Sequence, residues 1–423
     1  MSHLDNILSA LGIKGLQPDP DHPHEILGEY KGLRCFLLHV IQRAAEASCP
    51  SCQGHGIRYG YKKSYVRMPR SMDIPYWLVV KKQRYQCLDC RRTYLSNSNL
   101  VDPGCFISNP VKHLVVKDAK SKVSVSDISK RHNVSWTTTQ REINKWSQLT
   151  DRAFDYLPEI LCIDEFRAVS TLKNSKMALS LVDGTTNKIM DICPDRKLSF
   201  LTKHFGQYSD KVRSNVKYFC TDMYEPFLGL ARKMFPSAFI CIDKFHVVQL
   251  ASRALNTCRI EVMKQIQDKV CYKTFKQFWR IPLTFSHRLD SFKTVWVSYL
   301  QTYKTQDYLL EQMLSQSEVL RATYEVYQSL LRAFAMNNAN LFEDILKTDR
   351  SRLHPQMRTT LATFRRFKQH IINGIKTGHT NGPMEANNNN IKVLKRIAYG
   401  YRNYNNFRNR ILLVYTETLK FAA

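Results

Sequence analysis

The chain has 423 residues, with 63 lysines and arginines against 36 aspartates and glutamates, and a formal net charge of +27. A hydrophobic fraction of 43% with 15 glycines and 15 prolines excludes a wholly disordered chain. The length predicts more than one domain. The positive charge is spread along the chain and favours a polyanionic partner, of which nucleic acid is the commonest. A basic protein of the membrane surface is the alternative.

The sequence also bounds the compartment. No stretch reaches the ~18 consecutive apolar residues that span a bilayer, so we expect no membrane partner. The first residues, "MSHLDNILSALGIKG", have neither a basic leader nor a long apolar run, which predicts no export signal. We therefore expect a cytoplasmic location, where thiols stay reduced. Burial or metal binding then explains the 12 cysteines better than disulfides do.

Composition and periodicity divide the chain into six predicted segments. We expect a multidomain α/β plus α protein, in which small DNA-binding modules precede an RNase H-like core with a helical insertion. The segments are a lead-in of mixed helix (1–48), a zinc-binding DNA-contact module (49–100), a helix-turn-helix domain (108–148), the first part of the core (158–243), the helical insertion (244–378) and a catalytic helix that completes the core (379–415).

Two C-x-x-C knuckles dominate the second segment. Cys49 and Cys52 form the first, Cys87 and Cys90 form the second, and strand-like sequence lies between them. Four thiolates at the ends of strands are typical of a zinc ribbon, so we expect one structural Zn²⁺. Four merely buried cysteines, or a redox pair, are the alternatives.

The same segment is strongly basic, which suits contact with DNA phosphates. Its lysines and arginines include Lys62, Lys63, Arg67, Arg70 and Arg84. The four that we expect to bind DNA are Lys81, Lys82, Arg91 and Arg92. The zinc is then expected to hold a DNA-reading surface together.

The sequence "VSVSDISKRHNVSWTTTQREINKW" predicts two short helices around a polar turn at 132–135. Ser124 or Ser126 is available to cap the first helix, and the second begins near Trp136. This pattern is typical of a helix-turn-helix, and an ordinary helical hairpin is the alternative. The side chains expected to point outward are Thr137, Thr138, Gln140, Arg141 and Lys145, of which the first four are expected to bind DNA.

Short apolar strands alternate with helices in the fourth segment. "EILCIDEF", "KMALSLVD" and "KIMDIC" predict three antiparallel strands with a hairpin turn at Asp183-Gly184, and "VKYFCTDM" and "AFICID" predict two more. This is the order of an RNase H-like fold, which places Asp164 and Asp222 on adjacent strands. Two adjacent carboxylates repel unless a cation lies between them, which favours Mg²⁺. A turn or cap role for each Asp is the alternative, and Glu165 is a competing ligand that strand alternation points to the opposite face.

The last helix is predicted to begin at Gly382-Pro383, which places Glu385 in its first turn. A carboxylate there either favours the helix dipole or, if the helix packs against the sheet, completes a three-carboxylate metal site. The basic residues behind it, which we expect to hold DNA phosphates, are Lys392, Lys395, Arg396 and Arg402. The neighbouring tyrosines, which either pack in a core or stack on bases, are Tyr399, Tyr401 and Tyr404.

Together these features resemble the ISL3 family of insertion-sequence DDE transposases over essentially the whole chain. The motifs that support the resemblance are "NGPMEANNNNIKVLKRIAYGYRNYNNFRNRIL", "CIDEF", "TDMYEPF", "CIDKFHVVQ" and "YQCLDCRRTY". The resemblance implies a catalytic triad of Asp164, Asp222 and Glu385. It also suggests that Asp243 and His246, a D-x-x-H pattern like that of Mutator-like transposases, help to organise the site or the bound DNA end.

The resemblance implies a bacterial, nucleoid-associated enzyme. Two Mg²⁺ (or Mn²⁺) ions held by the triad are expected to activate water for cleavage at the terminal inverted repeats, after which the freed 3′-hydroxyl attacks target DNA. The expected partners are double-stranded DNA, at the transposon ends and at the target, and further copies of the chain in a homodimer or larger assembly. The alternatives are a zinc-dependent DNA-binding regulator with an inactive nuclease-like domain, and a tyrosine recombinase, for which no Arg/His/Arg/Tyr arrangement is evident.

Overall fold

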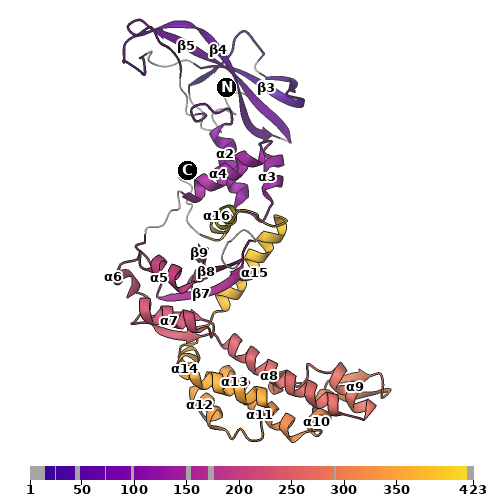
Figure 1. The fold of residues 1–423 in the computed structure, drawn as a ribbon. Helices are drawn as coiled ribbons and strands as arrows, with labels where there is room; N and C mark the ends of the chain where they lie inside the picture. The colour runs from indigo at the N-terminus through magenta and orange to yellow at the C-terminus, as the bar shows by residue number, and fades with distance from the viewer. Residues whose placement is uncertain are drawn as a thin grey trace. The chain divides into compact units, whose positions relative to one another are not determined.

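The computed structural model describes residues 15–23, 25–42, 48–71, 73–96, 100–148, 154–169, 176–289 and 292–416. The first fourteen residues, for which the sequence predicts no export signal, lie outside this part of the chain. The chain forms two compact units, one of residues 1–151 with 393–423 and one of residues 152–392 (Figure 1). The first unit therefore combines the two ends of the chain.

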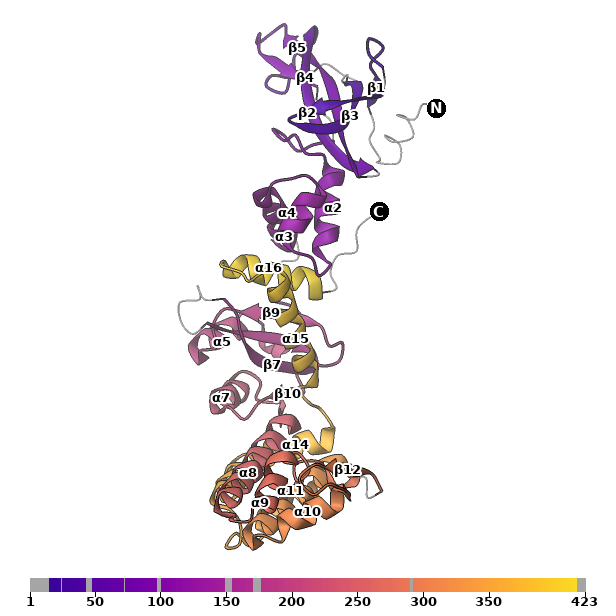
Figure 2. The same cartoon turned by 90° about the vertical axis from the view of Figure 1, so that its right-hand side faces the viewer.

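A six-stranded sheet opens the first unit (Figure 2). Its strands are β1 (Leu16–Pro18), β2 (Glu25–Tyr30), β3 (Leu33–Gln42), β4 (Gly56–Ser71), β5 (Ile74–Cys87) and β6 (Thr93–Leu95). β3 pairs with β2 on one side and, in parallel, with β5 on the other. The prediction of mixed helix for 1–48 is therefore wrong over the described strands. The last five residues of β3 are all buried, so this run lacks the two-residue alternation that would have indicated a strand.

Three helices follow the sheet, and α16 from the C-terminal end of the chain packs with them. They are α2 (Asn109–Ala119), α3 (Val125–Arg131), α4 (Trp136–Gln148) and α16 (Tyr404–Tyr415). The predicted cap is confirmed, because Ser124 Oγ accepts the Asp127 N–H at 3.1 Å. The predicted turn before α4 is confirmed as well, and Asn133 adopts a left-handed conformation there (φ 50°).

Arg410 on α16 is the largest fully buried side chain of the described residues, at 1% exposure. Its Nη2 donates to the carbonyl oxygens of Ser121 (3.0 Å) and Val123 (2.7 Å), in the loop between α2 and α3. Burial lowers the pKa of the guanidinium. These two hydrogen bonds fasten the C-terminal helix to the helix-turn-helix region.

The second unit contains a five-stranded sheet with strand order β11-β10-β7-β8-β9. The strands are β7 (Ile160–Arg167), β8 (Met177–Asp183), β9 (Ile189–Cys193), β10 (Tyr218–Thr221) and β11 (Phe239–Ile242), and the intervening helices are α5 (Leu198–Phe205), α6 (Asp210–Arg213) and α7 (Glu225–Met234). β7, β8 and β9 are antiparallel neighbours, whereas β10 and β11 run parallel to β7. The five predicted strands are confirmed. The hairpin turn is wider than predicted, because residues 184–188 connect β8 to β9 and Asn187, not Gly184, has a positive φ.

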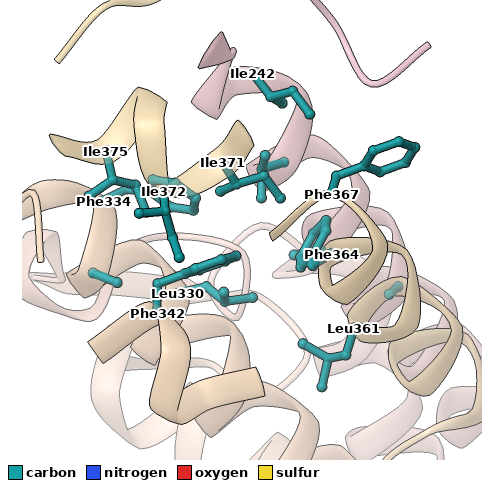
Figure 3. Packing of buried hydrophobic residues seen from close by; sticks show 14 of the residues in the cluster. Ile242, Leu330, Phe334, Phe342, Leu361, Phe364, Phe367, Ile371, Ile372 and Ile375 are labelled. Carbon is teal, nitrogen blue, oxygen red and sulfur yellow. The ribbon is translucent and has the colours of Figure 1, made fainter. Parts of the chain in front are cut away.

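A mostly helical region follows β11 and extends to residue 377. Its elements are α8 (Lys244–Gln265), α9 (Lys269–Gln277), the 3-10 turn η1 (Ser286–Arg288), the hairpin β12 (Thr294–Val297) with β13 (Thr302–Thr305), α10 (Gln306–Leu314), α11 (Glu318–Ala335), α12 (Ala339–Lys347), α13 (Pro355–Arg366) and α14 (Lys368–Thr377). Its core includes Leu330, Phe342 and Phe364, which lie between the helices in Figure 3. No helix among the described residues is long and apolar enough to cross a membrane.

α14 packs directly on the end of β11, and a glycine makes this approach possible. A Cβ added at Gly374 would lie 2.7 Å from the Ile242 carbonyl oxygen. Asn373 Nδ2 also donates to the Ile240 carbonyl at 3.0 Å. This contact determines where the chain enters the segment that follows α14.

We predict opposite effects for alanine at two helical glycines. Gly374→Ala should lower the free energy of unfolding by about 1–3 kcal/mol, because a backbone oxygen cannot move aside cheaply. Gly229 on α7 has no atom within 4 Å of its added Cβ, so Gly229→Ala should stabilise by about 0.5–1 kcal/mol. Urea unfolding followed by circular dichroism measures both, and equal effects of the two substitutions would contradict the packing described.

Candidate active site

Three acids lie at the same level of three neighbouring parallel strands: Asp164 lies within β7, and Asp222 and Asp243 directly follow β10 and β11. The register places Cys220 of β10 opposite Cys162 of β7 and Cys241 of β11. Two residues further along each strand come Asp164, Asp222 and Asp243. Since side chains two apart share a face of a sheet, the three carboxylates form a row, with the three cysteines as a second row beneath them. The sequence predicts that Asp164 and Asp222 are neighbours, but it does not predict the row of cysteines.

The pKa values of these three acids are raised, mainly because the carboxyl groups are partly buried. Partial burial, with a smaller contribution from the Asp222 carboxylate, raises the pKa of Asp164 to about 6. Burial likewise raises the pKa values of Asp222 and Asp243, and His246 lowers the pKa of all three acids. Oxygen-rich sites in which charged carboxylates are disfavoured are suited to a hard divalent cation.

Asp243 and His246 belong to the first turn of the long helix α8. The Asp243 carboxylate caps this helix by accepting the Phe245 N–H at 3.2 Å. The D-x-x-H spacing therefore places the imidazole one turn beyond a capped carboxylate. The positive end of the α8 dipole also favours negative charge at this edge of the sheet.

Helix α15 (Gly382–Ile397) approaches the same edge through two buried asparagines. Asn388 Nδ2 donates to Asp164 Oδ2 at 2.7 Å. Asn381, just before the helix, donates through Nδ2 to the Ile163 carbonyl at 3.1 Å, and its backbone N–H donates to the Asp243 carboxylate. The Oδ1 atoms of both asparagines are buried and accept no hydrogen bond from any described residue. Neither asparagine is among the site residues that the sequence predicts, although both lie in the motif around Glu385.

Glu385 is exposed in the first turn of α15. It precedes Asn388 by three residues, so about 4.5 Å of helix axis separates it from a side chain that contacts Asp164. Among the described residues, no group of three possible ligand atoms within 4.8 Å includes Glu385, Asp164 or Asp222. The structure thus brings Asp164, Asp222, Asp243 and His246 together and places Glu385 on the helix that contacts Asp164, without forming a compact triad.

Glu165, the competing ligand, is engaged elsewhere. Its carboxylate accepts Arg196 Nη1 at 2.6 Å. A short charge-assisted hydrogen bond of this kind is strong, so the Glu165 carboxylate is less available as a metal ligand.

The four knuckle cysteines form a compact cluster in the first unit. Their sulfur atoms all lie within 4.8 Å of one another, with 3.6 Å between Cys49 and Cys90 and 3.5 Å between Cys52 and Cys87. A tetrahedral Zn²⁺ with Zn–S bonds of ~2.3 Å separates its sulfurs by ~3.8 Å, so the cluster fits a zinc ribbon. The Ser51 N–H donates to Cys49 Sγ and, together with hydrogen bonds from Cys52 and Cys90, lowers the pKa of Cys49 to about 6, whereas the contacts with Cys87 and Cys90 raise the pKa of Cys52.

The basic residues predicted to bind DNA on this module differ in availability. Lys81 Nζ is held by Asp19 Oδ2 (2.7 Å) and Asp21 Oδ2 (3.0 Å). Lys82 is partly buried, which lowers its pKa, and the nearby Lys62 lowers it further. Arg91 and Arg92 are exposed at the second knuckle. Lys81 is thus the least available of the four predicted contacts.

On α4 the predicted outward face is wrong at one position. Gln140 is only 5% exposed, and its Nε2 donates to Asn144 Oδ1 at 3.0 Å. Thr137 and Arg141 are exposed, Thr138 is partly exposed, and Trp136 is 50% exposed. The physical reason is that the buried side of α4 is polar, so hydrophobic periodicity misplaces it by part of a turn.

The basic segment after Glu385 is largely accessible. Lys392, Arg396 and Arg402 are exposed, and Lys395 is partly exposed. Tyr399 is 98% exposed with φ 54°. Tyr401 instead packs on Phe407, with ring centroids 4.8 Å apart. The tyrosines of this segment therefore divide between surface and core.

Comparison with known proteins identifies the class as transposase. A transposase family profile matches residues 161–411, and this span includes every acid of the strand-end row, His246 and Glu385. The chain belongs to this family, the ISL3 family of DDE transposases. A Lactococcus lactis subsp. lactis protein named "ATP-dependent protease" is 38% identical over 117 residues, which is 28% of this chain. The chain matches 37% of the length of that relative.

We predict that the acid row is a source of instability in the metal-free protein. Asp164 has a pKa of about 6 when folded, against 3.8 when unfolded. Protonation of Asp164 therefore contributes to the free energy of unfolding fully below pH ~4, and this contribution is lost as the pH rises through about 6. Because the carboxylate is partly exposed, the cost above that range is at most about 3 kcal/mol.

Asp164→Asn should therefore raise the unfolding midpoint in EDTA at about pH 7.5 and make little difference at about pH 4.5. Urea titrations at the two pH values measure this. Asp344→Asn, at an exposed acid on α12, serves as the matched control and should shift neither midpoint. An unchanged midpoint for Asp164→Asn at the higher pH would contradict the assignment.

Proposed function

We propose that this chain is the DNA transposase of a bacterial insertion sequence. It binds the terminal inverted repeats and catalyses metal-dependent cleavage and strand transfer. The main support is one observation: Asp164 within β7 lies level with Asp222, which directly follows the adjacent parallel strand β10, and Asn388 bonds the helix of Glu385 to Asp164.

The catalytic unit is proposed to be an RNase H-like core with a helical insertion. Three antiparallel strands followed by two strands parallel to the first, in the order β9-β8-β7-β10-β11, support this assignment. The insertion of α8 to α14 lies between the fifth strand and α15. We further propose that this helical region contributes contacts in a homodimer or larger assembly on DNA.

Asp164, Asp222 and Glu385 are proposed to hold two divalent cations. The partly buried carboxylates with raised pKa values, and the buried amide oxygen of Asn388 without a donor, fit hard ions that prefer oxygen ligands. Mg²⁺, or Mn²⁺ in its place, supplies charge stabilisation of the phosphoryl group and a more acidic attacking hydroxyl.

The side chains around the acids fix the positions of the carboxylates and compensate part of their negative charge. The Asn388 amide orients Asp164 without adding charge, and Asn381 fixes the start of α15 by hydrogen bonds to β7 and to Asp243. His246 lowers the pKa values of the acids, so it helps to keep them ionised. Asp243 holds the first turn of α8 in place.

The first unit is proposed to bind the duplex. The zinc ribbon-like cluster and the helix-turn-helix provide the framework. The residues proposed to contact DNA are Arg91, Arg92, Lys82, Thr137, Thr138, Arg141, Lys395, Arg396 and Arg402, with Lys392 from the second unit. Phosphate contacts of this kind give affinity, and base contacts from α4 give specificity.

The protease name of the Lactococcus relative is not carried over. None of the 15 glycines of this chain is followed by lysine, so the sequence contains no G-x-x-x-x-G-K-[ST] loop that would bind ATP phosphates.

We predict that each triad acid is needed for cleavage and not for DNA binding. Asp164→Asn, Asp222→Asn and Glu385→Gln should each reduce Mg²⁺-dependent cleavage by on the order of 10³-fold, because each removes a cation ligand worth several kcal/mol. The substrate is labelled duplex containing the DNA that flanks the coding sequence, and nicked and joined products are scored.

End binding by these variants should remain within about threefold of the parent by gel shift, because the triad lies outside the proposed phosphate contacts. Glu318→Gln, at an exposed acid on α11, is the control and should cleave normally. Binding of the DNA end without Mg²⁺-dependent cleavage by the parent would favour the regulator alternative, and cleavage by Asp164→Asn at the parent rate would remove Asp164 from the catalytic triad.

We predict one zinc ion per chain, held by the four knuckle cysteines. Cys52→Ser should lose that zinc and, with it, DNA binding, because the cluster joins both knuckles of the sheet. Elemental analysis of the purified protein measures the ion, and Cys105→Ser, outside the cluster, should retain it. A zinc-free parent protein with intact DNA binding would rule out this role.

A further inference from the structure

The first unit contains a cavity of about 440 Å³ at the amino end of α4. One wall is a face of the six-stranded sheet, and the opposite wall is the turn between α3 and α4. The residues that matter for its chemistry are Tyr30, Lys63, Tyr65, Arg67, Trp77 and Thr138. No aspartate or glutamate lines it.

Arg67 is the central cation of this cavity. It is partly buried, and its guanidinium lies 4.6 Å from the Trp77 ring centroid. Among the described residues, its guanidinium forms no ion pair, its buried Nε atom has no hydrogen-bond partner, and burial lowers its pKa. A partly buried cation without a counter-ion is costly unless an anion reaches it.

The aromatic floor holds the cations in place. Tyr30 stacks on Tyr65 with centroids 4.4 Å apart and meets the Trp77 ring edge-on at 4.6 Å. Lys63 Nζ lies 6.0 Å from the Tyr65 centroid. Rings packed in this way leave little rotamer freedom, so the Arg67 guanidinium on Trp77 is pre-organised at little further entropic cost.

The helix wall adds hydrogen-bond donors. Ser135 Oγ accepts the Thr138 N–H at 3.1 Å and donates to Thr138 Oγ1 at 2.9 Å. This cap leaves the other N–H groups of the first turn of α4 directed toward the same end, where the helix dipole is positive. A planar guanidinium, a lysine, hydroxyls and a helix amino terminus together match the oxygens of a phosphate.

We propose that this cavity binds one backbone phosphate of duplex DNA, with Arg67 as its principal ligand and Thr138 and the first turn of α4 as secondary ligands. The inference rests on the proposed function, which supplies DNA as the partner. A phosphate bound here fixes how deeply α4 enters the groove of the DNA and which base pairs it faces, while Thr137 and Arg141 remain available to contact bases. The contact is therefore independent of sequence.

The test uses the full-length protein and two fluorescein-labelled duplexes of about 30 bp, one with the element end and one of arbitrary sequence, titrated from about 50 to about 300 mM NaCl. Arg67→Met keeps the packing on Trp77 and removes the charge. It should weaken binding to both duplexes about tenfold at low salt and reduce the slope of log K against log salt by about 0.9, the value for one phosphate.

Arg67→Lys should restore most of the slope but only part of the affinity, because lysine lacks the bidentate fork. Arg321→Ala, which removes the same charge from an arginine paired with Glu311 in the second unit, should leave the slope unchanged. Thermal unfolding confirms that each variant is folded.

Three outcomes are distinguishable. An unchanged slope and affinity for Arg67→Met, with normal binding by the parent, overturns the cavity assignment alone. Failure of the parent to bind either duplex overturns the proposed function itself. Calorimetry with inorganic phosphate is the last measurement: Arg67-dependent phosphate binding with an unchanged DNA slope would assign the cavity to a free anion and overturn the proposal.

Discussion

The repulsion between carboxylates on adjacent parallel strands is the constraint around which the second unit is arranged. The register of β7, β10 and β11 places Asp222 between Asp164 and Asp243, so the three side chains are direct neighbours. Two charges about 5 Å apart near a protein surface repel by about 3 kcal/mol. Burial is the main cause of the raised pKa values of the three acids, and the neighbouring carboxylates raise the pKa values of Asp164 and Asp222 further. Such an arrangement is unfavourable for folding alone, and strained electrostatics of this kind are concentrated at functional sites.

The groups around the acids relieve that repulsion without removing the charges. The amino end of α8 and His246 supply partial positive charge. Asn388 approaches Asp164 with an amide. A lysine at that position would pair with Asp164 and compete with any incoming cation, whereas an amide orients the carboxylate and leaves its charge available. The choice of asparagine is thus consistent with a site that must exchange ions.

The sequence predicted the elements whose signals are local. The strands of the second unit were predictable because each is a short apolar run bounded by polar or turn residues, and the acids are the polar residues that interrupt or follow these runs. The knuckle spacing revealed the cysteine cluster. Non-local or polar features were not predictable: β3 gains its place from a partner strand about forty residues away, and Gln140 is buried on a polar helix side. Asn388 is one of four consecutive asparagines, and the sequence alone does not indicate which of them faces Asp164. Only the packing of α15 shows this.

The parallel pairing of β3 with β5 also limits how this protein can be divided. Seven residue pairs, Phe36 with Tyr76 through Gln42 with Lys82, join the two strands. A fragment starting at residue 49 would keep all four cysteines and lose this partner. The inner edge of β5 would then present unpaired amides beside the apolar Leu78 and Val80, which are buried in the intact sheet. Edges of this kind recruit other chains, so such a fragment would tend to aggregate even when loaded with zinc.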